Sequence, residues 1–335
     1  MTKEGKYTAL FRDFNQLRIL IIGDVMLDSY LWGKVDRISP EAPIPIVALQ
    51  KRENRMGGAA NVALNVKALG SEPILCSVIG DDDKGDQLLD LFRTQAISDT
   101  GMIRSRERVT TTKFRVFGNH YQMLRVDEEV DHDLSEQDHR ELITRIGTIL
   151  NGERIHCIIF QDYNKGVITE GLIREVVSLA GRMDIPIAVD PKKRNFNAYR
   201  GVTLFKPNLK ELKEGLKTDL SADDQELVIQ AAQSLRRILE CRYVMTTLSE
   251  KGVLMSLADE LTEKNIFVPA HARSVADVSG AGDTVISVAS ACLARGCSPY
   301  EIAYISNLAG GLVCQEVGVV PVNKEKLLKE VLALL

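Results

Sequence analysis

The strongest chemical signal in the sequence is a run of small residues next to carboxylates, Asp277-Val278-Ser279-Gly280-Ala281-Gly282-Asp283-Thr284. It precedes an apolar segment that we expect to form a helix to about Arg295. Gly280, Ala281 and Gly282 would present backbone N–H groups at the positive end of the helix dipole, with no side chain to obstruct an anion. The pattern therefore predicts a phosphate or oxyanion site.

Asp283 lies in the first turn of that expected helix. A carboxylate beside a transferring phosphoryl group can take a proton from an attacking hydroxyl, so the residue types suit phosphoryl transfer. The alternative is structural: the small residues allow close packing of the helix, and Asp283 is an N-terminal capping charge.

A second signal is Gly57-Gly58-Ala59-Ala60-Asn61, which opens another expected helix that Gly70 ends. Asn61 could bond sugar hydroxyls because an amide is both donor and acceptor. A plain packed helix start is the alternative. The chain has no GxxxxGK[ST] motif, and no GxGxxG follows its first expected strand, which argues against P-loop and dinucleotide-binding sites.

Short apolar runs alternate with amphipathic segments, a pattern that predicts a parallel α/β sheet covered by helices on both faces. One of the amphipathic segments, around Leu172 to Ala180, should end at Gly181 in a left-handed cap. The expected strands are Ile19 to Gly23, Ile74 to Ile79, Cys157 to Phe160, Ile185 to Asp190, Thr203 to Phe205 and Tyr243 to Thr247.

Three further runs, at 44–49, 110–117 and 121–126, read as strands outside this sheet, with Gly118-Asn119 as a tight hairpin turn. Lys113 and Arg115 should share one face because side chains alternate along a strand. Arg125 joins them if the register allows. We expect a small antiparallel lid with a polar inner face.

Composition excludes several classes of protein. The 335 residues carry 42 Lys plus Arg against 46 Asp plus Glu, a net charge of −4, so we expect no nucleic-acid partner. No apolar run approaches the roughly 20 residues that span a bilayer, and the first residues lack a signal-peptide core. The six cysteines lack CxxC spacing, which is typical of reduced thiols in a cytoplasmic protein without membrane contact.

The motifs occur in the order and spacing of the ribokinase-like (PfkB) carbohydrate kinases, which the chain resembles from about Arg18 to Val322. The motifs that carry this resemblance are Gly57-Gly58 with Asn61, Gly80-Asp81-Asp82, Asn208-Leu209-Lys210-Glu211 and 277–283. A narrower set resembles the kinases of ADP-heptose synthesis, which phosphorylate D-glycero-D-manno-heptose 7-phosphate at the anomeric oxygen. That set comprises 23–28, 37–43, 57–63, 162–166 and 190–192.

The resemblance implies a three-layer α/β fold in one kinase domain over residues 1–335, with lid strands around 31–50 and 108–127. The histidines form no His-x-Gly-His motif, so no nucleotidyltransferase domain is expected. The resemblance also implies a homodimer formed through the lid strands.

On the nucleotide side, the resemblance implies ATP and Mg²⁺ as cofactors and leaves a monovalent-cation requirement open. Asp283 matches the catalytic base, and Gly280, Ala281 and Gly282 match the anion hole. Asn208 and Glu211 match the motif that organises the metal. The nucleotide-binding positions are Thr246, Ser249 (glycine in the family), Gly252, Asp277, Asn307 and Gly318.

On the sugar side, the resemblance implies that Asp28, Gly57, Gly58 and Asn61 hold the hydroxyls and that Asp162 faces the acceptor. A sugar that carries its own phosphate also needs cations. The candidates are Lys113, Arg115, Arg125, Lys165, Lys192 and Lys193.

The resulting expectation is ATP-dependent phosphorylation of the heptose 7-phosphate to the 1,7-bisphosphate for ADP-heptose synthesis. Three alternatives stay open. The first is a ribokinase-like kinase for another sugar or sugar phosphate, and the second is an idle sugar-binding regulator built on this fold. The third, an NAD-dependent sugar dehydrogenase, is disfavoured by the missing glycine fingerprint.

Overall fold

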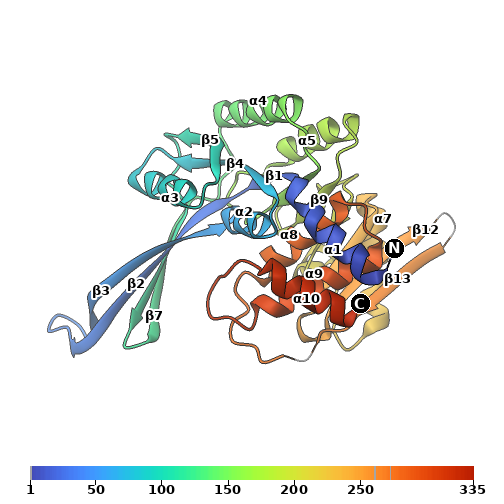
Figure 1. Ribbon diagram of the computed structural model, residues 1–335. Coiled ribbons are helices and arrows are strands. Elements are labelled where there is room, and N and C mark those ends of the chain that lie inside the picture. Colours follow the sequence, from blue (N-terminus) through green and yellow to red (C-terminus); the bar gives the residue numbers. More distant parts are fainter. Residues whose placement is uncertain (1, 260–261, 272) are drawn as a thin grey trace.

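The computed structural model describes residues 2–259, 262–271 and 273–335, and in these residues a central sheet lies between two layers of helices (Figure 1). The sheet has nine strands, parallel except where β12 pairs with β11 and β13. In spatial order these are β13 (Thr262–Val268), β12 (Val253–Asp259), β11 (Tyr243–Thr247), β10 (Leu204–Phe205), β9 (Ile187–Asp190), β8 (Cys157–Gln161), β1 (Arg18–Gly23), β4 (Glu72–Gly80) and β5 (Ser98–Ser105).

The strands alternate their side chains between two apolar cores. In β1, Ile19 and Ile21 enter one core while Leu20 and Ile22 enter the other. The first core packs under α1 (Lys3–Asp13), α2 (Ala59–Ala68), α3 (Asp83–Thr94), α8 (Ala281–Ala294), α9 (Pro299–Val313) and α10 (Lys324–Leu334). The second packs under α4 (Glu136–Gly152), α5 (Glu170–Arg182), α6 (Leu209–Leu216) and α7 (Gln225–Leu239). Two 3-10 turns, η1 (Phe14–Gln16) and η2 (Ser249–Lys251), complete the helices.

The six strands expected from the sequence are all present, and the expected parallel sheet with helices on both faces is confirmed. The strand β5 and the antiparallel pair β12 and β13 were not predicted from the sequence. The expected cap at Gly181 is wrong, because α5 continues to Arg182 and Asp184 takes the left-handed conformation at φ 53°.

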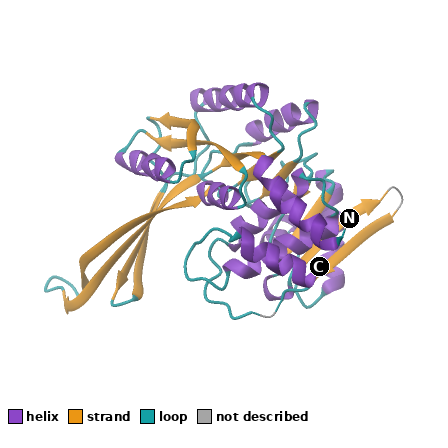
Figure 2. Ribbon diagram, viewed as in Figure 1, coloured by secondary structure: helices purple, strands orange, loops and turns teal. Residues whose placement is uncertain are grey.

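A second sheet projects from the body and consists of four strands in the order β3, β2, β6, β7 (Figure 2). These are β2 (Val25–Ile38), β3 (Pro45–Gly58), β6 (Thr112–Gly118) and β7 (Tyr121–Glu128), and we call them the lid sheet. The strands exceed the expected ranges, since β2 begins at Val25 and β3 reaches Gly58. The lid sheet is also not wholly antiparallel, because β2 and β6 run parallel.

The hairpin between β6 and β7 turns one residue later than expected. Gly118 pairs with Tyr121, so Asn119 and His120 form the loop, and both have positive φ, 50° and 72°. Such a pair of residues is the signature of the primed turns that match strand twist. The expected face is confirmed: Arg115 lies directly opposite Arg125, and Lys113 lies opposite Asp127 on the same side.

The six cysteines are free thiols. Among the helices of the described residues, none combines the length and apolar character needed to cross a bilayer.

The ends of β1 and β8 approach so closely that the chain requires glycine at position 23. A Cβ on Gly23 would lie 2.0 Å from the carbonyl oxygen of Gln161. We therefore expect Gly23→Ala to lower the free energy of unfolding by about 3 kcal/mol, as overpacking does. Gly147→Ala is the matched control, because a Cβ there meets nothing and alanine favours the helix by about 0.5–1 kcal/mol. Urea unfolding measures both, and equal stability of the two variants would contradict the close approach.

Candidate active site

Asp283 lies in the first turn of α8, at the carboxyl edge of the parallel strands. The helix begins after Gly280, whose φ of 79° is left-handed and suits glycine. The Asp283 side chain is buried. The helix expected from the sequence over this segment is confirmed, and Gly296, two residues beyond it, takes a φ of 66°.

Three side chains from separate elements donate hydrogen bonds to the Asp283 carboxylate. Asn61 Nδ2 of α2 lies 2.7 Å from Oδ2. Gln161 Nε2, at the end of β8, and the Tyr163 hydroxyl lie 3.1 and 2.8 Å from Oδ1. No sequence pattern predicts a separate role for Gln161 or Tyr163. These contacts fix the carboxylate in one orientation.

Burial raises the pKa of the Asp283 carboxyl to about 6, although the Asn61 hydrogen bond opposes it. The nearby Asp190 carboxylate also raises this pKa. A carboxylate with such a pKa can accept a proton near neutral pH, which is the property that a general base needs.

A buried ion pair lies beneath the start of α8. Lys206 Nζ lies 3.1 Å from Asp190 Oδ1, and both side chains are less than a tenth exposed. A Cβ on Gly282 would be 3.9 Å from Lys206 Nζ. The ammonium group therefore lies close to the glycine turn, by which we mean residues 280–282. Lys206 was missed from the sequence. The one sequence feature that could have indicated a role for Lys206 is its position directly after the expected strand Thr203 to Phe205, two residues before Asn208.

The glycine turn matches the expected anion hole in part. The Ala281 N–H donates to the Val278 carbonyl oxygen at 3.3 Å, closing a turn, so this amide is not free as expected. Gly280 and Gly282 have no backbone acceptor for their N–H groups in the described part of the chain. Two amides at the positive end of a 14-residue helix are therefore available to an incoming anion.

The expected nucleotide residues fall into two groups. Asp277 and Gly318 are brought together, because Asp277 Oδ2 accepts from the Gly318 N–H at 3.0 Å while Oδ1 accepts from Ser279. Asn307 of α9 donates to the Pro269 carbonyl oxygen at 3.0 Å.

The second nucleotide group follows β11. Thr246 is buried with an unpartnered hydroxyl. Ser249 adopts a φ of 52°, in the left-handed region, which suits the glycine that the family resemblance places at this position. Gly252 has a φ of 100° and lies with its Cα against the Val268 carbonyl oxygen, where a Cβ would be 2.1 Å away.

Asn208 and Glu211, the expected metal-organising residues, form a capping box at the start of α6. Asn208 Oδ1 accepts from the Glu211 N–H, and Glu211 Oε2 accepts from the Asn208 N–H, both at 2.8 Å. The other oxygen, Glu211 Oε1, pairs with Lys192. Burial opposes the protonated form of Lys192, but the carboxylates of Asp190 and Glu211 raise the pKa of this amine. No cluster of three metal-ligating side chains occurs in the residues that the structure describes.

On the sugar side, Asp28 of β2 is buried and pairs with Arg115 of the lid sheet. Gly57 lies against the Asp28 side chain, since a Cβ there would be 2.5 Å from Asp28 Oδ2. Gly58 has a φ of 60°, and its turn lets the Ala59 N–H reach the Asp24 carbonyl oxygen at 2.9 Å. Asp28 and the Gly57-Gly58 turn therefore adjoin as expected.

Asp162, expected to face the acceptor, accepts three hydrogen bonds within the protein. Its Oδ2 accepts from Tyr199 at 2.8 Å and Asn195 at 3.1 Å, and its Oδ1 accepts from the Asn164 N–H at 2.8 Å. Because it is buried and fully bonded, its geometry is that of a residue that holds the 162–166 loop. Asp24, for which the sequence predicted no role, holds the same loop. Its carboxylate accepts hydrogen bonds from the backbone N–H groups of Tyr163, Lys165 and Val167.

Five of the six expected phosphate-binding cations have carboxylate partners, and Lys193 has none among the described residues. Lys113 lies 3.1 Å from Asp127 and 3.2 Å from Glu129, and Lys165 Nζ lies 2.6 Å from the same Glu129. Arg125 makes two bonds to Asp127, at 2.9 and 3.0 Å. Burial opposes the charge of Glu129, but hydrogen bonds from the two lysines lower its pKa. An incoming phosphate must therefore replace acidic partners at this edge of the lid sheet.

Polar atoms without a partner collect beside Asp283. Asn61 Oδ1 and Gln161 Oε1 are buried acceptors without a donor, on the two amides that bond Asp283. Asn164 Oδ1, in the next loop, is also unpartnered. Buried acceptors without donors are costly, so these three are positions where hydroxyls of a bound sugar would be favourable.

Known proteins resemble this chain in sequence and in structure. The pattern of the pfkB family carbohydrate kinases matches residues 16–326. The bifunctional protein HldE of Methylobacillus flagellatus is 39% identical over 312 residues, 93% of this chain and 62% of its own length. HldE of Geotalea uraniireducens is 36% identical over 323 residues, 96% of this chain and 64% of its own length. The chain thus spans somewhat under two thirds of these relatives.

Solved structures confirm the expected fold. Phosphofructokinase-2 of Escherichia coli superposes with a TM-score of 0.76 at 19% identity, covering 94% of this chain and 99% of the other. An Arabidopsis thaliana ribokinase, solved with ribose and ATP, gives 0.71 at 17% identity, with 93% and 98% covered. Three observations point to the same kind of protein. They are the family match, the buried carboxylate in the first turn of α8 and the ribokinase-like fold. The chain belongs to the pfkB family of carbohydrate kinases, phosphotransferases that act on a sugar hydroxyl.

Proposed function

We propose that this kinase transfers the γ-phosphoryl group of ATP to the anomeric hydroxyl of D-glycero-β-D-manno-heptose 7-phosphate, giving the 1,7-bisphosphate for ADP-heptose synthesis. The observation that carries the chemistry is the buried Asp283 carboxylate, held by three donors directly beside two free backbone amides. The resemblance of 23–28, 37–43 and 162–166 to heptose kinases and the likeness to HldE proteins support the substrate.

The residues have distinct parts in the transfer. Asp283 accepts the proton of the attacking hydroxyl, while Asn61 and Gln161 orient its carboxylate. The amides of Gly280 and Gly282 stabilise charge on the transferred group. Most of the rate enhancement in such reactions comes from positioning and electrostatics.

The carboxylates near the proposed phosphate site fit a magnesium ion. Asp190, at the end of β9, and Glu211, in the first turn of α6, supply carboxylate oxygens, and Mg²⁺ binds such oxygens while keeping several waters. Bound Mg²⁺ would neutralise charge on the triphosphate. Lys192 and Lys206, paired with these carboxylates, would reinforce that neutralisation.

The lid sheet supports a substrate that carries its own phosphate. Lys113, Arg115 and Arg125 share one face, and Lys165 reaches the same acidic partner as Lys113. A sugar without a phosphate has no need of this cluster. The second candidate function is a ribokinase-like kinase that acts on a different sugar phosphate. The same four cations favour it, because they would bind the phosphate of any such sugar.

The first test measures ADP release with Mg-ATP and three sugars: the heptose 7-phosphate, fructose 6-phosphate and ribose. We expect turnover that depends on the heptose phosphate. Asp283→Asn should fold normally and lose about a thousandfold in kcat, as expected for loss of a general base. Asp90→Asn, an exposed carboxylate of α3, is the matched control and should retain full activity. Turnover with another sugar would discard the substrate, and activity of Asp283→Asn within tenfold of wild type would discard the base.

The second test concerns Arg125. Arg125→Ala removes a charge-assisted contact, so we expect KM for the phosphorylated sugar to rise about tenfold and KM for an unphosphorylated sugar to stay within about twofold. Arg140→Ala, an exposed arginine of α4, is the control. Equal effects on both sugars would show that Arg125 does not contact the phosphate.

We also propose a homodimer through the lid sheet. Leu124 and Val126 lie on the face of β7 opposite Arg125 and are 56% and 47% exposed. Because exposed apolar strands at a sheet edge favour pairing with another chain, we expect a dimer at micromolar concentration. Leu124→Asp should convert it to a monomer in sedimentation experiments while keeping the circular dichroism spectrum. A monomeric wild-type protein would refute the dimer.

A further inference from the structure

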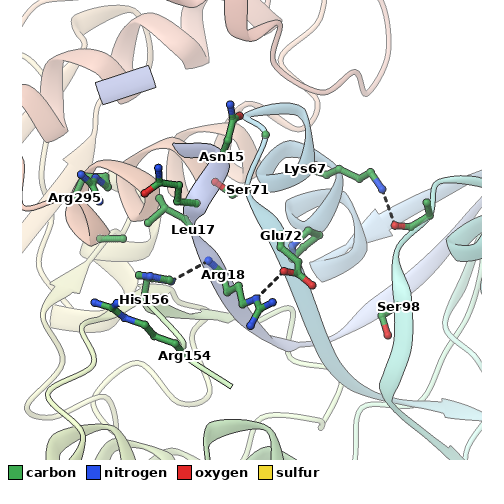
Figure 3. A pocket seen from close by; sticks show the side chains of 15 residues that line it. Asn15, Leu17, Arg18, Lys67, Ser71, Glu72, Ser98, Arg154, His156 and Arg295 are labelled. Carbon is green, nitrogen blue, oxygen red and sulfur yellow. Dashed lines mark hydrogen bonds and ion pairs between the residues drawn. The ribbon is translucent and has the colours of Figure 1, made fainter. Parts of the chain in front are cut away.

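A cavity of about 910 Å³ lies at the amino-terminal edge of the central sheet, the edge opposite Asp283 (Figure 3). Arg18 begins β1, Glu72 begins β4 and Ser98 begins β5. His156 directly precedes β8, and Arg295 directly follows α8. The cavity shares no lining residue with the catalytic site described above, so the two can be studied separately.

The cavity wall carries mostly positive charge. Its lining includes Arg18, Lys67, Arg154 and Arg295, against the single acidic side chain of Glu72. Figure 3 shows Arg154, His156 and Arg295 together at one end, with Lys67 and Ser98 at the other. The cavity is therefore polarised, with a cationic end and a hydroxyl-bearing end.

Most of these cations are already paired. Arg18 lies 2.7 Å from Glu72 and 3.5 Å from Glu153, and Arg295 lies 2.8 Å from Asp13. Arg154 differs, since it makes no hydrogen bond or ion pair with any residue that the structure describes. One positive charge at the cationic end is thus uncompensated by the protein.

His156 adds a directed donor to the same end. Its Nδ1 accepts the backbone N–H of Arg18 at 3.0 Å, so the neutral ring carries its proton on Nε2. Burial, and then the charge of Arg154, lower the pKa of this imidazole, with the charge of Arg295 acting in the same direction. The neutral ring is a donor among guanidinium groups, which is an arrangement suited to an oxyanion.

We propose that this cavity binds a small phosphate monoester, with the phosphate held by Arg154, Arg295 and His156 and a hydroxylated body directed towards Ser98 and Lys67. The volume is within the roughly 300–1,000 Å³ typical of small-molecule sites. Arginine is well suited to phosphate because its planar fork donates two parallel hydrogen bonds. A sugar phosphate and a nucleoside monophosphate share this chemistry, and the experiment distinguishes them.

The test uses His156 as a local reporter, so that binding at the catalytic site does not interfere. Protein with ¹³C-labelled histidine is titrated with inorganic phosphate, AMP and fructose 6-phosphate, and His156→Asn assigns the resonance among the five histidines. We expect a saturable shift of the His156 signal. The pKa of His156 should rise, because a bound phosphate adds negative charge that favours the imidazolium. Tighter binding of fructose 6-phosphate than of AMP identifies a sugar phosphate, and the reverse order identifies a nucleotide.

A matched pair of variants checks the geometry. Arg154→Ala should weaken binding about tenfold, since a charge-assisted contact is lost and the exposed, unpaired side chain has no structural partner. Arg174→Ala, an exposed arginine of α5, should leave binding unchanged. The proposal is overturned if no anion shifts His156, if the shift grows without saturating, or if Arg154→Ala titrates as the wild type does.

Discussion

The site depends on one interaction, the burial of the Asp283 carboxylate among three donors. Asn61 comes from α2, Gln161 from the end of β8, and Tyr163 from the loop that follows. None of these elements can shift without breaking a contact with the base. The close approach of Gly23 to Gln161 fixes β1 against β8, and Asp24, the next residue, holds the loop that carries Tyr163. The fold and the chemistry thus share the same few contacts.

The second constraint is charge balance. Nearly every cation close to the proposed substrate already has a carboxylate partner: Arg115 with Asp28, Lys113 and Lys165 with Glu129, Arg125 with Asp127 and Lys192 with Glu211. Such pairing holds cations in place without a ligand. In the proposed function, binding of the sugar's phosphate would be an exchange of partners, in which a dianion competes with fixed carboxylates. Discrimination between phosphorylated and unphosphorylated sugars would follow from that competition.

Sequence patterns could predict the parts of this protein that local rules determine. The buried parallel strands are short apolar runs, and α8 and α2 begin at glycine turns and end before Gly296 and Gly70. The shared face of Lys113, Arg115 and Arg125 followed from strand alternation. The hairpin turn lies one residue later than the expected Gly118-Asn119. Asn119 and His120 adopt positive φ although neither is glycine, and a prediction based on glycine turns does not include such a pair.

What escaped prediction depends on contacts between distant segments. Lys206 and Asp190 meet only because β10 and β9 are neighbours in the sheet. The burial of Asp162 beside Tyr199 and Asn195 has no local signature in the sequence, because those two residues lie more than 30 positions further along the chain. The pairing of Asn208 with Glu211 was visible as a motif, but its spacing serves a capping box as well as a metal.

The most direct test of Asp283 as the base is the pH dependence of kcat/KM, compared between the wild type and Tyr163→Phe. The base must be ionised to work, so activity should rise with pH around the Asp283 pKa of about 6. Because the Tyr163 hydrogen bond lowers that pKa, its loss should move the acidic limb to higher pH. The ionisation of the substrate's own phosphate is the same for both enzymes and cannot produce this displacement. Superimposable profiles, or a limb at the ordinary carboxyl value, would contradict the account.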